Sequence, residues 1–158
     1  MATQKDFTAD EWKKVAAAPF MAGMIVTMAD LSGIIGLTKE AAAVGKVIME
    51  SAASSSSELI RGLGESFKGG ARPEMPALPK DREQARTSFV QMCALAAAAV
   101  AAKSPAEAQE FKAWLMSIAR KAAEAAKEGG FLGFGGTQVS AQEQAALSQL
   151  GTALGVRA

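Results

Sequence analysis

The glycine-rich segment 129–136, Gly-Gly-Phe-Leu-Gly-Phe-Gly-Gly, is the stretch whose composition comes nearest to a chemical motif. Backbone N–H groups of such a loop in front of a helix can bind phosphate. The candidate ligand-binding residues are its glycines: Gly129, Gly130, Gly133, Gly135 and Gly136. No predicted strand precedes the loop and no Gly-Lys-Ser/Thr ends it, so the dinucleotide and Walker patterns both fail. Its bulky apolar residues favour a buried helix connection, with a nucleotide site or enzyme as the alternative.

Four carboxylates at predicted helix junctions are the candidates for a divalent-cation site. They are Asp30, Glu40, Glu128 and Glu143. Carboxylate oxygens suit Ca²⁺ or Mg²⁺, but the ligand spacing of an EF-hand loop is absent. Acidic residues at such positions also cap backbone N–H groups and favour the start of a helix. The sequence leaves both interpretations open, and we expect no cofactor other than a divalent cation.

The residues that the sequence lacks exclude several kinds of function. There is no His, which removes Ser-His-Asp and Cys-His catalysis as well as imidazole metal sites. The one cysteine, Cys93, lies in an apolar run and is predicted to be a buried hydrophobic residue rather than a nucleophile. The net charge is +1 without a basic block, so no nucleic-acid partner is expected. We therefore expect an interaction or ligand-binding module rather than an enzyme.

Helix signals dominate the rest of the chain. Three segments combine a hydroxyl with a Glu three residues later, which is the pattern of a capping box: Thr8–Glu11, Ser104–Glu107 and Ser140–Glu143. Asp81 and Thr38 are further predicted caps. Apolar residues recur every three or four positions after each start, and no stretch alternates with period two. The sequence predicts a single all-α domain over 1–158, a bundle of about five to six helices.

Three breaks are predicted within this pattern. Pro19 should kink or break the first long helix, and the serines at 54–57 favour an interruption of the second. The segment 68–80 contains three prolines and two glycines and is predicted to be a loop. It joins two halves, 1–67 and 81–158, whose similar order of helices and glycine-flanked apolar pairs suggests an internal repeat.

Two segments, Val15–Ala29 and Thr87–Ala102, carry no charge. Each is too short to span a membrane, so we expect no transmembrane segment but two central helices of a bundle. A bundle of this size can bury one such helix fully, and the second then favours self-association, most simply as a dimer, or a protein partner. Methionines on the apolar faces predict core packing, with an apolar small molecule or lipid as an alternative ligand.

The beginning of the chain has acidic residues where a secretion signal would have basic ones, and the single cysteine is compatible with a reducing compartment. We therefore expect a cytoplasmic protein.

The arrangement of the two halves resembles the bacterial tellurite-resistance TerB-like family. The similarity is carried by Ala29-Asp30, Gly33 and Glu40 in the first half, and by Ala126-Lys-Glu128-Gly129, Ser140 and Glu143 in the second. The resemblance implies a helical, stress-linked bacterial protein with acidic residues near a metal. The chain departs from the family where Leu31 follows Asp30 in place of Gly, and where Glu128 stands in place of Asp.

Overall fold

The computed structural model describes residues 1–29, 34–77, 79–128 and 139–157, with side chains except at 34–40 and 126–128. In this part of the chain there are six α-helices, one short 3₁₀ helix and no strand. The elements are η1 (Gln4–Asp6), α1 (Ala9–Thr27), α2 (Ile34–Ala53), α3 (Glu58–Lys68), α4 (Arg82–Lys103), α5 (Pro105–Glu128) and α6 (Ala141–Leu154). The predicted all-α helical bundle is confirmed.

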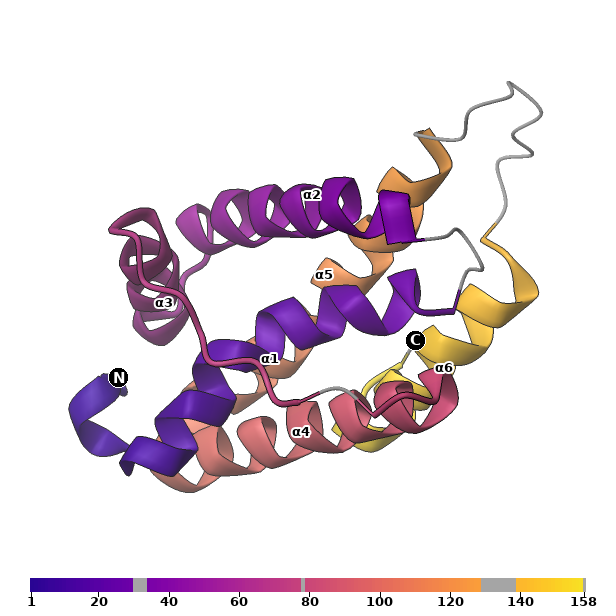
Figure 1. Cartoon of the computed structure of the whole chain (residues 1–158). Coiled ribbons are helices and arrows are strands. Elements are labelled where there is room, and N and C mark those ends of the chain that lie inside the picture. Colours follow the sequence, from indigo (N-terminus) through magenta and orange to yellow (C-terminus); the bar gives the residue numbers. More distant parts are fainter. Residues whose placement is uncertain (30–33, 78, 129–138, 158) are drawn as a thin grey trace.

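Helix α1 lies in the middle of the bundle (Figure 1). It packs most extensively against α4 and α5, and it also contacts α2 and α6. Its charge-free part is covered on nearly every side, because most of its residues from Val15 to Thr27 are buried and the others are half-buried. The apolar core of the protein is therefore built around α1.

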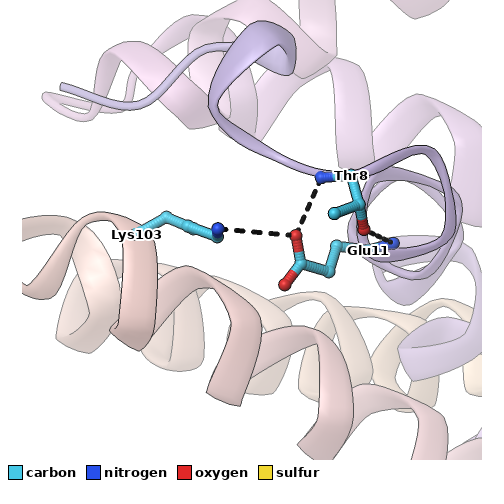
Figure 2. A network of polar contacts seen from close by, with 3 residues as sticks. All are labelled: Thr8, Glu11 and Lys103. Carbon is cyan, nitrogen blue, oxygen red and sulfur yellow. Dashed lines mark hydrogen bonds and ion pairs between the residues drawn. The ribbon is translucent and has the colours of Figure 1, made fainter.

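Capping boxes fix the starts of α1 and α6, as the sequence predicts. The Thr8 N–H donates to Glu11 Oε2 at 2.8 Å, and the Glu11 N–H donates to Thr8 Oγ1 at 3.2 Å (Figure 2). Lys103, at the end of α4, places its Nζ 3.9 Å from Glu11 Oε2. This cap consequently also ties the beginning of α1 to the end of α4.

The structure differs from the prediction at two helix boundaries: α1 is not broken at Pro19, and α2 does not begin at Thr38. Helix α1 continues without interruption through Pro19, which is buried. Packing on all sides of α1 outweighs the hydrogen bond that a proline cannot donate.

Helix α2 begins at Ile34, so Thr38 lies inside the helix and does not cap it. Leu37 precedes Val44 at helical spacing, and this apolar pattern extends the helix by one turn before Thr38.

The two other predicted interruptions are confirmed. Helix α2 ends at Ala53, and α3 begins after Ser57, whose hydroxyl accepts the Ile60 N–H. After α3 the chain turns at Gly70, whose φ of +93° is a left-handed conformation that favours glycine. From there an irregular segment crosses α1 and reaches the start of α4 (Figure 1). We call its residues 72–80 the proline strap.

Candidate functional site

The candidate ligand-binding glycines, Gly129, Gly130, Gly133, Gly135 and Gly136, lie outside the described residues. Of the four candidate metal ligands, Asp30 lies outside them, and so do the side chains of Glu40 and Glu128. Glu143 is described: it is buried, and its Oε2 accepts the Ser140 N–H at 2.8 Å as part of the α6 capping box. In the part of the chain that is described, no three His, Cys, Asp or Glu residues gather where they could hold a metal ion.

Cys93 is fully buried, and its thiol donates to the Ala18 carbonyl with an Sγ–O distance of 3.6 Å. Burial raises the pKa of this thiol far above its ordinary value. The group therefore stays neutral and inaccessible, which agrees with the interpretation of Cys93 as a buried hydrophobic residue.

Glu107 is the best-connected buried carboxylate in the described structure. Its Oε2 accepts the Ala2 N–H and the Ser104 hydroxyl, each at 2.8 Å. Its Oε1 accepts the Ser57 hydroxyl at 2.7 Å and the Leu59 N–H at 3.1 Å. Burial by itself would raise the pKa of this carboxyl, but the four donors outweigh burial and lower the pKa to about 2.

Glu110, one turn further along α5, binds the serines between α2 and α3. Its carboxylate accepts the hydroxyls of Ser55 and Ser56 at 2.6 and 2.7 Å. It also accepts the backbone N–H groups of Ser56 and Ser57 at 3.0 and 3.1 Å. These hydrogen bonds, led by the one from the Ser55 hydroxyl, lower the pKa of Glu110.

Glu107, Glu110 and Ser55–Ser57 together form what we call the glutamate clamp. The hydrogen-bond donors to the two carboxylates come from this protein's own helix ends and loops, and both pKa values lie below the ordinary range. A base of such low pKa accepts a proton poorly near neutral pH. The clamp joins the chain before α1 and the α2–α3 loop to α5, so its geometry fits a structural role. The Ser104–Glu107 pattern in the sequence was predicted only as a local cap.

Helix α4 has an uncharged and partly apolar exposed face. No charged residue lies between Arg86 and Lys103, and Leu95 is 53% exposed. Ala98 and Ala102 continue the exposed stripe at helical spacing. Of the described helices, α4 is the one long and apolar enough to cross a membrane by length and composition. Fewer than half of the residues in its most apolar window are buried, so the helix has an outer face that the bundle leaves open.

A groove of about 400 Å³ lies between α1, α4 and the proline strap. Its lining mixes charged side chains with methionines: Asp10, Lys13, Lys14, Ala17, Glu74, Met75, Pro76 and Met92. Lys13 spans its edge, with Nζ 2.9 Å from Glu74 Oε2. The sequence predicts a loop here but not the groove that it covers, because nothing in the sequence says which helix a loop crosses.

No protein-family model, curated protein or solved structure matches this chain.

Proposed function

We propose that this chain is a non-catalytic helical interaction module and that its outer α4 face binds a second copy of the chain. The observation that carries the proposal is the uncharged exposed stripe of α4, with Leu95 at 53% exposure. A contiguous apolar face of this kind on a folded protein is typical of a surface that another protein covers.

The composition of this face favours a second copy of the same chain as the partner. The face carries no charge between residues 87 and 102, so two identical faces do not repel one another. Leu95 and Ala98 lie one turn apart on the same side, one bulky and one small. A two-fold pairing can set each leucine against the alanine of the other copy, as an isologous contact requires. The small alanines also let the two helix backbones approach closely.

Two arguments support binding rather than catalysis. The sequence has no His, and the carboxylates of the glutamate clamp, buried Glu107 and half-buried Glu110, are engaged by structural donors. The resemblance to TerB-like proteins adds the proposal that such a module acts in a bacterial cytoplasm under stress. The divalent-cation site of that family stays part of the same proposal, to be tested by calorimetric titration with Ca²⁺ and Mg²⁺.

A second candidate function, the carriage of an apolar small molecule, is favoured by the groove under the proline strap. Its volume falls in the usual range for small-molecule sites, and Met75 and Met92 give it adaptable apolar walls. Native mass spectrometry of the purified protein tests this candidate. A lipid or other apolar molecule that co-purifies and is lost from a Met92→Glu variant would support it, and a bare protein mass would count against it.

The principal experiment is multi-angle light scattering over a tenfold range of micromolar concentration. We expect a dimer that Ala98→Glu converts to a monomer, because the new carboxylates would be buried against an apolar face in the dimer. Ala113→Glu is the matched control, since Ala113 is an exposed alanine in the middle of α5. A mass that stays monomeric at every concentration, or a dimer that survives Ala98→Glu, would refute the proposal.

A further inference from the structure

The proline strap has a periodicity of three in both its sequence and its burial. Pro73, Pro76 and Pro79 are half-buried, and the other described residues of the segment are exposed. Its described residues make no backbone–backbone hydrogen bond. A period of three and a backbone without such hydrogen bonds are properties of a polyproline II helix. The pattern therefore indicates a polyproline II-like segment, and its Pro76 lies beside residues of α1 and α4.

Two kinds of contact hold the strap on its own bundle. The Lys13–Glu74 ion pair is the one salt bridge between the described strap residues and the bundle, and its side chains are 57% and 73% exposed. Such an exposed pair contributes about 0–1 kcal/mol. The three prolines are only half-buried, and a groove beside Pro76 leaves the strap loosely packed at that point. A competitor for the proline face therefore has to replace the partial burial of three prolines and one exposed ion pair.

We propose that the proline strap is a docking segment for a partner protein whose groove is lined by aromatic side chains. A polyproline II segment with the Pro-x-x-Pro spacing fits such grooves, and it loses little conformational entropy on binding because its backbone is already extended. The strap places Arg72 and Lys80 at its two ends, both exposed. The partner's groove consequently carries acidic side chains at one or both of its ends. This contact is separate from α4 and would occur in a monomer or a dimer.

Binding requires the proline face to leave α1, so the intramolecular contact competes with the partner. Lys13→Gln removes the ion pair from the α1 side without altering the strap. The partner should then bind more tightly, by about fivefold at most, which is the fold-change that corresponds to the upper range of an exposed ion pair.

The test is a titration of the full-length chain against two purified probes, an SH3 domain and a WW domain, followed by the tryptophan fluorescence or NMR shifts of the domain. At least one domain should bind the wild type and bind Lys13→Gln more tightly. The double variant Pro76→Ala/Pro79→Ala should lose at least about tenfold in affinity, equivalent to about 1.4 kcal/mol. Ala77→Ser, at an exposed position between the prolines, is the matched control and should bind like the wild type.

Circular dichroism of each variant shows whether the bundle is still folded. If neither domain binds the wild type or Lys13→Gln, the proposal is wrong. It is also wrong if binding is unchanged in the folded proline double variant, because the domain would then contact another surface.

Discussion

Helices α1 and α4 each contain a long charge-free segment, yet the two helices are buried to different extents. The segment of α1 from Val15 to Thr27 is enclosed by α2, α4, α5 and α6. Helix α4 packs against α1, α5 and α6 on one side and leaves Leu95 exposed on the other. An absence of charge thus marks a helix as compatible with the core, but it does not decide how many sides of that helix are covered.

The side chains of the two helices account for part of this difference. Helix α1 buries branched and long side chains such as Met21, Ile25 and Val26, and burying them stabilises the fold by roughly 1.5–3 kcal/mol each. The outer face of α4 is built mostly of alanine, which gains little from burial. Placing α1 in the centre therefore buries the larger apolar area.

The largest expected effect comes from placing the same charge on the two helices. Ala18 of α1 is fully buried, so Ala18→Glu would put a carboxylate into the core and should destabilise the fold by more than about 4 kcal/mol. Ala98→Glu on the exposed side of α4 should change the stability of the single folded chain by no more than about 0.5 kcal/mol, compared at a concentration where both proteins are monomeric. Thermal unfolding followed by circular dichroism measures both, and equal losses would abolish the distinction between the two helices.

The second effect concerns the glutamate clamp, which ties the chain before α1 to α5. The pKa of Glu107 in the folded protein is about 2, below its ordinary value of 4.5, so its ionised form stabilises the fold. That contribution of roughly 3 kcal/mol is complete above pH 4.5, declines as pH falls, and is lost below about pH 2. Glu107→Gln should remove this contribution at neutral pH. The free energy of unfolding of the variant should also depend less on pH between about 2 and 4.5 than that of the wild type.

Urea unfolding at several pH values between 2 and 7 measures this change. Glu124→Gln is the matched control, because Glu124 is exposed on the same helix. If Glu107→Gln kept the stability and the acid dependence of the wild type, the clamp would not secure the N-terminal end of α1.

The smallest expected effect concerns the packing of α2 against α1. A Cβ atom on Gly23 would lie 2.8 Å from Val44 Cγ2 and closer still to Cγ1. Because valine is stiff in a helix, Gly23→Ala should push α2 away and cost about 1–3 kcal/mol. Gly62→Ala in α3 meets no atom within 4 Å and should instead stabilise by about 0.5–1 kcal/mol. Denaturant midpoints compare the two, and a stabilising Gly23→Ala would mean that α2 does not hold α1 tightly.

Much of the fold is predictable from local signals in the sequence. The caps at Thr8, Asp81 and Ser140 are confirmed because a capping side chain binds an N–H group only a few residues away. The prediction at Thr38 fails because apolar spacing continues on its N-terminal side. Of the kink or break predicted at Pro19, the break does not occur, because the helices packed around α1 outweigh a local rule.

The candidate site was less predictable, because its contacts join residues far apart in the chain. The hydrogen bonds of Glu107 to Ala2 and Ser57 cross 105 and 50 residues, and no local pattern encodes them. The period-three prolines of the strap were visible in the sequence and would have indicated polyproline II. Which helix the strap crosses could not be read from them.

The central position of α1 has a consequence for synthesis on the ribosome. The helices that enclose α1 most extensively, α4 and α5, follow it by tens of residues. At a synthesis rate of about 5–20 residues per second, roughly 5–20 seconds pass between the completion of α1 and that of α5. The helix that becomes most enclosed in the folded protein is thus made first and covered late, and Glu107 reaches the Ala2 N–H only after that delay. During elongation α1 is the natural target for a chaperone.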